Sequence, residues 1–428
     1  MPRVTIESLD REGRGVARRD GKAVFVEGGL TGETVEYAVV RDKPTFEIGR
    51  VEAVLEPSAE RVEPRCRFFG ICGGCAMQHL DVRAQVAAKQ RVLEDALWHI
   101  GRVRPETMLR AIYGEPWGYR HRARLSARFV PKKGGSLVGF HERKSSYVAD
   151  MTSCEVLPGT ISRLLPALRR LVDGLSIRER MPQIEVSIGD AATVLVFRVL
   201  EPPGPADGER LRAFADAHGV QVWLQPAGPE SAARFWPEDA PALDYALADF
   251  DVRIGFLPTD FTQVNHGVNR ILVRRAMALL DPRPGERIGD LFCGLGNFAL
   301  PIARLGAAVT GFEGNAGLIE RARANARANG LEAEFRAIDL FDAAACAELP
   351  AFDKALLDPP RDGAIELVKS FAARPPRRIV YVSCDPATLA RDAGVLVQAQ
   401  GYRFAAAGAV NMFPHPAHVE SLALFERD

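Results

Sequence analysis

Hydrophobic and polar positions are arranged differently in three successive parts of the chain, and each arrangement predicts a different kind of structure. In the first part, from Arg3 to about Leu55, short apolar segments are separated by turn signals such as Asp20-Gly21 and Gly28-Gly29. Segments of this kind are typical of strands joined by hairpins. We therefore predict a small, OB-like β-barrel, and Glu56-Pro57-Ser58 marks its end.

The middle part begins with a predicted helix and continues as a mixture of elements. Asp81 is a suitable N-cap for this helix, and Gly101 is a suitable terminator. Its apolar positions recur at helical spacing and are Val82, Val86, Leu93, Leu97 and Ile100. From Trp117 to about Phe256, strands mix with helices such as Ile161–Leu175, which predicts an α+β domain.

The last third alternates regularly between strands and helices. Apolar, strand-like runs occupy Ala307–Glu313, Lys354–Asp358 and Arg378–Ser383, and helical segments such as Gly317–Asn329 separate them. This alternation predicts a mostly parallel, doubly wound, Rossmann-like sheet. We therefore expect three domains, over residues 1–56, 57–262 and 263–428 of this α/β multidomain chain.

Composition adds a location and a redox state to this picture. The chain has 428 residues, 47% of them hydrophobic and 26% charged, which is ordinary for a globular protein. No apolar run approaches the length of a membrane span, and the first residues lack the apolar region of a signal peptide. We expect a cytoplasmic protein without a membrane partner, in which cysteine thiols stay reduced.

Charge is balanced overall, with 55 basic and 55 acidic residues, but it is locally uneven. Between Pro116 and Tyr147 basic residues strongly outnumber acidic ones, and Arg120, Arg122 and Arg124 alternate. In a strand these three arginines would share one face. Such a face suits a nucleic-acid backbone, although it is equally typical of a solvated sheet surface.

Three of the seven cysteines, Cys66, Cys72 and Cys75, lie in one short, glycine-rich stretch. Because thiols are reduced in the expected compartment, metal ligation is favoured over disulfides. An iron–sulfur centre for electron transfer is the first interpretation of such a cluster. Cysteines could equally hold zinc.

A glycine turn follows the expected strand Glu286–Asp290. Gly294 and Gly296 permit a tight turn and close approach of a ligand, and Glu313 ends the next strand, where a carboxylate can bind ribose hydroxyls. The turn fits the fingerprint for NAD. Asp290 favours S-adenosylmethionine instead, because a carboxylate there would repel a pyrophosphate and tolerate a sulfonium.

Three further residues lie where strands of the last part end or begin. Asp358 precedes two prolines that stiffen its loop, although Asp-Pro also opens ordinary turns. Cys384 follows a strand and precedes a helix capped by Asp385, a position that favours the thiolate; burial as a small apolar residue is the alternative. Glu420 shares a strand face with leucines, which would raise its pKa, unless it lies at a wet strand end.

Together these residues suggest one reaction. Uracil C5 is too weak a nucleophile to take a methyl group unaided, and a thiolate that adds to C6 activates it. A base must then remove the C5 proton so that the thiolate can leave. Cys384 and Glu420 could supply these two roles, on a base flipped out of structured RNA.

The chain resembles the bacterial RNA uracil-C5 methyltransferases over nearly its whole length. The motif Val382-Ser383-Cys384-Asp385-Pro386 matches the family's nucleophile motif, and the segment from Pro414 to Glu420 matches its base motif. By this resemblance Cys384 is the nucleophile and Glu420 is the base. Phe261–Asn265 resembles the stretch before the family's methyltransferase domain. The implied donor-binding residues are Gln263, Phe292, Asn297, Glu313, Asp339 and Asp358. Asp339 stands where the family often has Asn, and an ionised Asp cannot donate a hydrogen bond.

The resemblance also bears on the N-terminal half. Residues 1–56 resemble a TRAM domain, an RNA-binding barrel. Cys66, Cys72 and Cys75 resemble the family's iron–sulfur signature, with Cys154 at the position of a fourth, distant ligand. This implies a 4Fe–4S cluster in the central domain, with zinc left open by spacing alone.

By this resemblance, the presence of both a barrel and a cysteine cluster indicates which RNA is the substrate. Relatives that act on tRNA are expected to lack both barrel and cluster, and a shorter rRNA relative to lack the barrel. The expected partner is therefore 23S rRNA, and the expected state is a monomer without an obligate protein partner. The alternatives are a tRNA methyltransferase, an NAD-linked iron–sulfur oxidoreductase and a non-catalytic RNA-binding protein.

Overall fold

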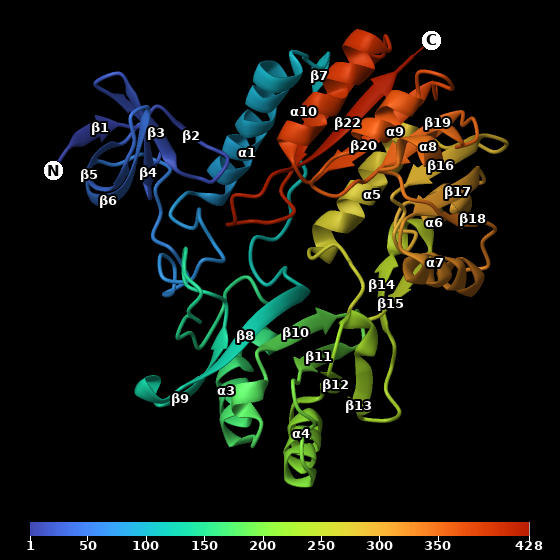
Figure 1. The fold of residues 1–428 in the computed structure, drawn as a ribbon. Helices are drawn as coiled ribbons and strands as arrows, with labels where there is room; N and C mark the ends of the chain where they lie inside the picture. The colour runs from blue at the N-terminus through green and yellow to red at the C-terminus, as the bar shows by residue number, and fades with distance from the viewer. Residues whose placement is uncertain (428) are drawn as a thin grey trace.

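The N-terminal part is a six-stranded sheet that curls into a barrel (Figure 1). The computed structural model describes residues 1–427. The strands lie in the order β1-β5-β6-β4-β3-β2 around their own apolar core, and β6 ends at Glu56, the expected boundary. The strands are β1 (Arg3–Thr5), β2 (Ser8–Leu9), β3 (Gly15–Arg19), β4 (Lys22–Glu27), β5 (Thr34–Asp42) and β6 (Phe46–Glu56).

The central part is a second six-stranded sheet, in the order β13-β12-β11-β10-β8-β9, covered by helices. The predicted helix Ile161–Leu175 is two helices, because Pro166 lacks the N–H needed in a helix interior and starts a new one. The elements are β8 (Arg122–Val130), β9 (Gly135–Gly139), α2 (Gly159–Ser162), α3 (Leu165–Gly174), β10 (Gln183–Ile188), β11 (Thr193–Arg198), α4 (Pro205–His218), β12 (Gln221–Gln225) and β13 (Ala233–Trp236).

The C-terminal part is an eight-stranded sheet in the order β18-β17-β16-β19-β20-β22-β21-β7. The run from β18 to β20 is parallel, as predicted, and β22 lies antiparallel between β20 and β21. The strands are β7 (Thr107–Met108), β16 (Arg287–Leu291), β17 (Ala308–Glu313), β18 (Glu334–Ala337), β19 (Lys354–Leu357), β20 (Arg378–Ser383), β21 (Arg403–Val410) and β22 (Glu420–Glu426).

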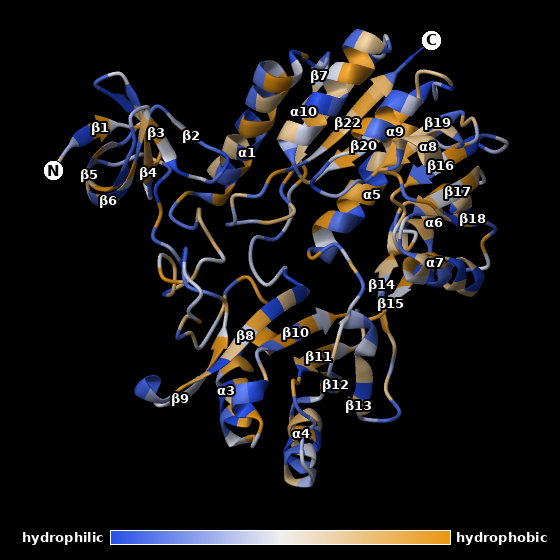
Figure 2. Ribbon diagram, in the orientation of Figure 1, coloured by the Kyte–Doolittle hydropathy of each residue, from blue (hydrophilic) through white to orange (hydrophobic). Residues whose placement is uncertain are grey.

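Helices cover both faces of this sheet, and its central strands are strongly hydrophobic (Figure 2). Every residue of β19 is buried, as expected of a strand covered on both sides. The helices are α5 (His266–Leu280), α6 (Ala299–Arg304), α7 (Ala316–Ala328), α8 (Ala343–Ala347), α9 (Ile365–Ser370) and α10 (Pro386–Gly394).

Two pieces of the expected central domain pack on the C-terminal sheet. Helix α1 (Val82–Ala96) is capped by Asp81 as predicted and continues as one π-helical turn, Leu97–Gly101; its Leu93 lies in the C-terminal core. The short β7 that follows pairs with β21. The hairpin of β14 (Leu243–Leu247) and β15 (Val252–Phe256) joins a second apolar cluster of the C-terminal part, separate from the one that contains Leu93. The division at residue 262 thus stays a prediction.

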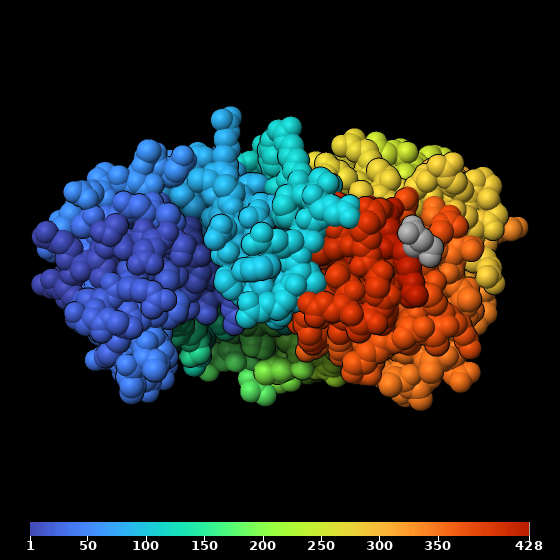
Figure 3. Space-filling view, turned by 90° about the horizontal axis from the view of Figure 1, so that it is seen from above, coloured from blue at the N-terminus to red at the C-terminus, as the bar shows by residue number. Residues whose placement is uncertain are grey.

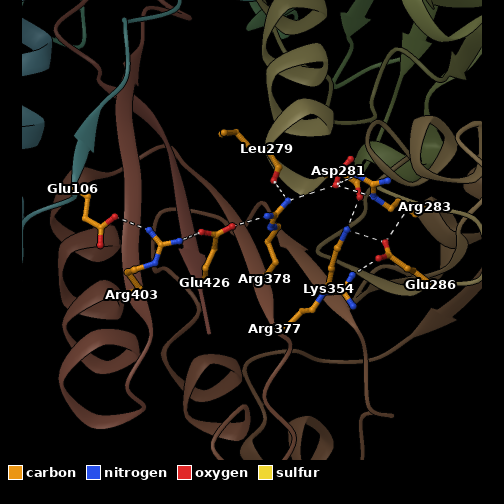
Figure 4. Close-up of polar contacts among 10 residues, drawn as sticks. All are labelled: Glu106, Leu279, Asp281, Arg283, Glu286, Lys354, Arg377, Arg378, Arg403 and Glu426. Carbon is orange, nitrogen blue, oxygen red and sulfur yellow. Dashed lines mark hydrogen bonds and ion pairs between the residues drawn. The ribbon is translucent and has the colours of Figure 1, made fainter. Parts of the chain in front are cut away.

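A chain of ion pairs runs across the end of the sheet at which the parallel strands begin (Figure 4). Lys354, at the start of β19, is 2% exposed and pairs with Glu286 at 2.9 Å, while Arg378 pairs with Glu426 at 2.6 Å. Glu426 also pairs with Arg403, which reaches Glu106 beside β7. These charges lie at one end of the strands, so the opposite, carboxyl-terminal ends are left for a ligand.

Candidate active site

A cavity of about 680 Å³ opens at the carboxyl ends of β16, β17, β19 and β20. This is where open parallel sheets bind their ligands. The cavity gathers every residue that the sequence assigns to catalysis or donor binding. These residues are Gln263, Phe292, Asn297, Glu313, Asp339, Asp358, Cys384 and Glu420. Their roles stay predictions, but their common location follows from the fold.

The glycine turn after β16 forms one wall of the cavity. Gly294 and Gly296 have φ angles of 52° and 92°, in the left-handed region that favours glycine. Phe292 has a φ of 69°, which is rare for a residue with a side chain and was not foreseen from the sequence. The N–H groups of Phe292 and Cys293 both donate to the Phe312 carbonyl, at 2.9 Å each, and so hold this conformation.

Asp290 does not act as the sequence argument assumed. Its side chain is completely buried at the end of β16, and burial, with smaller contributions from Asp358 and Glu313, raises its pKa to about 8. A raised pKa favours the uncharged acid, which weakens the repulsion of a pyrophosphate that the sequence argument assumes. The choice of cofactor therefore rests on other evidence.

Asn297 and Gln263 are held by protein partners at the rim of the cavity. Asn297 Oδ1 accepts hydrogen bonds from the Tyr245 hydroxyl and from Asn269 Nδ2, both at 2.9 Å. Gln263 Nε2 donates to Asp358 Oδ2 at 3.5 Å. Burial raises the pKa of Asp358 to about 7, and the bond from Gln263 lowers it only partly. The cavity thus holds a carboxyl group that is poised to ionise near neutrality.

Cys384 lies at the end of β20, and Asp385 caps α10 as predicted by accepting bonds from Ala387 N and Thr388 N. The expected stabilisation of the thiolate is not found. Burial, followed by the negative charges of Glu420 and Asp358, raises the pKa of Cys384 to about 11, while Arg361 and the residue's own backbone N–H oppose the rise. Burial and the two carboxyl groups therefore outweigh the helix end, and the thiol needs a cationic ligand or a base to ionise.

Glu420 is the first residue of β22 and is 5% exposed, so the alternative of a wet strand end is wrong. Burial raises its pKa to about 8, Asp358 adds to this rise, and Lys89 opposes it. The direction agrees with the sequence prediction. A carboxylate with this pKa is a competent general base near neutral pH.

Several cavity residues were not foreseen as site residues. Arg361 and His418 are hydrogen-bonded to each other on the cavity wall, and Arg120 stacks over the Phe413 ring at 5.5 Å. Phe261 is 69% exposed at the rim. The signal for Arg120 was its place in the basic segment, and Phe261 and His418 lie in the two segments that carry the family resemblance, whereas the pairing of Arg361 with His418 depends on tertiary contacts.

The basic segment is only partly a free cationic face. Arg124 pairs with Glu185 at 3.0 Å, and Arg122 pairs with the same carboxylate at 3.7 Å. Arg122 also donates to the Thr259 carbonyl. One acid on the neighbouring strand β10 therefore offsets part of the charge, and Arg120 alone of the three arginines lines the cavity.

The four predicted metal ligands come from two segments that meet beside the central sheet. Cys154 is buried, and Cys66, Cys72 and Cys75 are partly buried. Burial raises the pKa of Cys75 to about 12, and the other three thiols add to this through their mutual repulsion. Within residues 1–427, no three His, Cys, Asp or Glu side chains are grouped as ligands of a single metal ion.

Comparison with known proteins identifies the class first. The chain is similar over 99% of its length to the whole chain of the Pyrococcus abyssi tRNA (uracil-54, C5)-methyltransferase, solved with S-adenosyl-L-homocysteine, at 25% identity and a TM-score of 0.76. Residues 2–51 match the TRAM domain. The fold and the site are therefore those of an S-adenosylmethionine-dependent methyltransferase with an N-terminal TRAM domain.

The family follows from closer relatives. Proteins named 23S rRNA (uracil(1939)-C(5))-methyltransferase RlmD are 61% identical in Aromatoleum aromaticum, over 100% of both chains, and 60% identical in Nitrosospira multiformis, over 99% of this chain and 98% of the relative. The chain belongs to the RlmD family of 23S rRNA (uracil-C5)-methyltransferases. An NAD-linked oxidoreductase is excluded by this membership. No helix within residues 1–427 is long and apolar enough to cross a membrane.

One expectation about substrate choice is wrong. Relatives that act on tRNA were expected to lack the barrel, yet the Pyrococcus tRNA enzyme covers 99% of this chain, the barrel region included. Architecture therefore does not separate the two RNA substrates. The discrimination rests on the 58–61% identity to rRNA enzymes, against 25% to the tRNA enzyme.

Proposed function

We propose that this chain methylates C5 of a uridine in 23S rRNA, with S-adenosylmethionine as donor and with a covalent bond between Cys384 and uracil C6. One observation carries the proposal: Cys384 and Glu420 line the same cavity as the glycine turn and its carboxylates. A nucleophile, a base and a place for the donor thus meet in one space, as the reaction requires.

The chain's own residues supply the steps on the uracil ring. The Cys384 thiolate adds to C6 and makes C5 nucleophilic. S-adenosylmethionine supplies an electrophilic methyl group on a sulfonium. Once C5 carries the methyl group, Glu420 takes the C5 proton. The electrons of the C5–H bond then form the C5–C6 double bond, the bond from Cys384 Sγ to C6 breaks, and its electron pair returns to sulfur.

The electrostatics of the cavity favour a cationic donor. Asp358, Glu313 and Asp339 line it, and a sulfonium among carboxylates is stabilised. A positive charge there would also offset the negative groups that raise the pKa of Cys384, and so favour the thiolate. We assign donor binding to these carboxylates together with Gln263, Phe292 and Asn297.

We also propose that Cys66, Cys72, Cys75 and Cys154 hold a 4Fe–4S cluster with a structural role. The four thiols suit this role, because positively charged iron offsets the mutual repulsion of their thiolates. Gly74 N donates to Cys72 Sγ at 3.4 Å, a contact typical of cluster-binding loops. The proposed reaction moves no electron, so the cluster would join residues 66–75 to the segment around Cys154.

The test is methyl transfer from labelled S-adenosylmethionine to unmodified 23S rRNA and to tRNA, with the modified nucleotide mapped. We expect 5-methyluridine in 23S rRNA alone. Methylation of tRNA alone would contradict the substrate. Iron and sulfide content after anaerobic purification tests the cluster, and zinc in place of iron would contradict it.

A further inference from the structure

Helix α1 buries a polar face, which is unusual for a helix packed on a hydrophobic sheet. Of the predicted apolar positions Leu93 and Leu97 are buried and Val82 and Val86 only partly so, while Gln85 and Lys89 are buried together with Leu93, at 0% and 2% exposure. Burial of a lysine is costly unless its ammonium is satisfied, so this face must have specific partners. Figure 3 shows the helix region between the N-terminal part and the C-terminal part of the molecule.

Gln85 donates to the Met77 and Leu80 carbonyls, and it shares with Lys89 and Gln90 a set of partners on the segment that leads into Glu420. Lys89 Nζ donates to Asn411 Oδ1 and to the Phe413 carbonyl, both at 2.7 Å. Gln85 Oε1 accepts from His415 N at 2.9 Å, and Gln90 Oε1 accepts from Ala409 N at 2.9 Å. Three neighbouring polar residues of α1 therefore fix the backbone from residue 409 to residue 415, which we call the base loop.

The base loop has a conformation that needs such support. His415 has a φ of 77°, a strained value for a residue with a side chain, and its ring stacks on Trp117 at 3.9 Å between centroids. Its carbonyl accepts from Ala76 N and Met77 N, at 3.0 and 2.9 Å. Tyr119 donates to the Pro414 carbonyl at 2.9 Å. The loop is thus held on several sides: Arg120 contacts the face of the Phe413 ring, and α1 supplies a cation, Lys89, that is hydrogen-bonded to the loop.

Lys89 brings a charge as well as hydrogen bonds. Both of its acceptors are uncharged, so no carboxylate among its bonded partners neutralises the ammonium. Burial lowers the pKa of Lys89 to about 7; among the surrounding charged groups Glu420 opposes this most, followed by Cys75. The Lys89 charge in turn disfavours the cationic forms of His415 and His418. Burial and then Asp358 raise the pKa of Glu420, Glu420 raises that of the Cys384 thiol, and Lys89 is the cation that lowers the pKa of Glu420.

We propose that Lys89 is a positioning residue for Glu420: it anchors the base loop and supplies the positive charge beside which the buried carboxylate ionises. This inference rests on the proposed role of Glu420 as the base for the C5 proton. It assigns a function in the last chemical step to a helix more than 300 residues away in sequence.

The test separates the charge from the anchor. Lys89→Gln keeps a donor for the Phe413 carbonyl and removes the charge, while Lys89→Arg keeps the charge. The pH dependence of single-turnover methylation is measured from about pH 6 to about pH 10 on 23S rRNA with saturating donor. Without the cation the pKa of Glu420 rises further, so the acid limb of Lys89→Gln moves upward by about 1 unit or more, a loss of roughly tenfold at neutral pH that alkaline pH restores.

The controls make each outcome decisive. Lys89→Arg retains the acid limb of the wild-type pH profile. Gln90→Leu removes an uncharged anchor of the same loop and leaves the acid limb at the wild-type pH. An unshifted limb in Lys89→Gln, or a loss that alkaline pH does not restore, would overturn the proposal. Lys89→Met is the second neutral variant if Lys89→Gln does not fold, with S-adenosyl-L-homocysteine binding as the check. Normal turnover of Glu420→Gln would refute the base itself rather than Lys89.

Discussion

The cysteines with proposed functions lie in two regions that share one property and differ in another. In both regions burial raises the thiol pKa: to about 12 for Cys75 and to about 11 for Cys384. The neighbours differ. Cys75 is surrounded by other thiols, whereas Cys384 faces the carboxyl groups of Glu420 and Asp358 and the guanidinium of Arg361.

The difference teaches how each thiol can ionise. Several thiols that repel one another lose their protons together when they bind a cationic metal. They then stay ionised for as long as the metal is bound. A single thiol among carboxyl groups ionises only when positive charge arrives, which ties its reactivity to the presence of donor and substrate. A cavity built this way keeps the nucleophile protonated between turnovers.

The sharpest test of this comparison is Cys384→Ala. Removal of the nucleophile leaves C5 unactivated, so methyl transfer falls by at least about 1,000-fold. The partly exposed position predicts little change in stability. Labelled methyl transfer and thermal unfolding measure the two effects. Retained turnover would show that the thiol among carboxyl groups is not the nucleophile.

Glu420→Gln produces the second largest effect. Glutamine cannot accept the C5 proton, so we expect addition and methylation without release, and a loss of turnover of about 100-fold or more. A protein–RNA adduct that survives denaturing electrophoresis should accumulate, and it should vanish in the double variant with Cys384→Ala. Loss of turnover without an adduct would place the role of Glu420 before bond formation.

Cys75→Ser should act on stability rather than on the ring chemistry. Loss of a ligand from the proposed cluster should lower the iron content and reduce the free energy of unfolding by about 3–5 kcal/mol. Cys346→Ser is the matched control, because Cys346 is a buried thiol of the C-terminal core outside both regions. Its iron content should equal that of the wild type. Equal destabilisation of the two variants, with iron unchanged, would argue against a cluster.

The sequence was sufficient to find the strand ends and much less informative about what surrounds them. Period and turn residues locate β17, β19 and β20 closely, and residues at the carboxyl ends of parallel strands must converge. The ionisation of Cys384 was missed because it depends on Glu420 and Asp358, which approach only in the fold. Helix periodicity placed Leu93 and Leu97 in the core correctly, but it missed the buried Lys89, which serves a polar loop far away in sequence.

Substitution of Cys293 should have the smallest effect, because this cysteine belongs to neither of the two regions with proposed functions. It lines the same cavity as Cys384 and is 4% exposed, so proximity alone would make it a rival nucleophile. Burial, with a contribution from Asp290, raises the pKa of the Cys293 thiol well above its usual value, and no arginine opposes this among the groups that act on it. Cys293→Ala should therefore retain turnover within about threefold and cost about 1–2 kcal/mol of stability through lost packing in the core. The protein–RNA adduct trapped by Glu420→Gln should form equally well in a double variant that also carries Cys293→Ala. Arg361 lowers the pKa of the Cys384 thiol, and no such arginine acts on Cys293. An adduct that depends on Cys293 would show that this difference does not determine which thiol attacks the uracil.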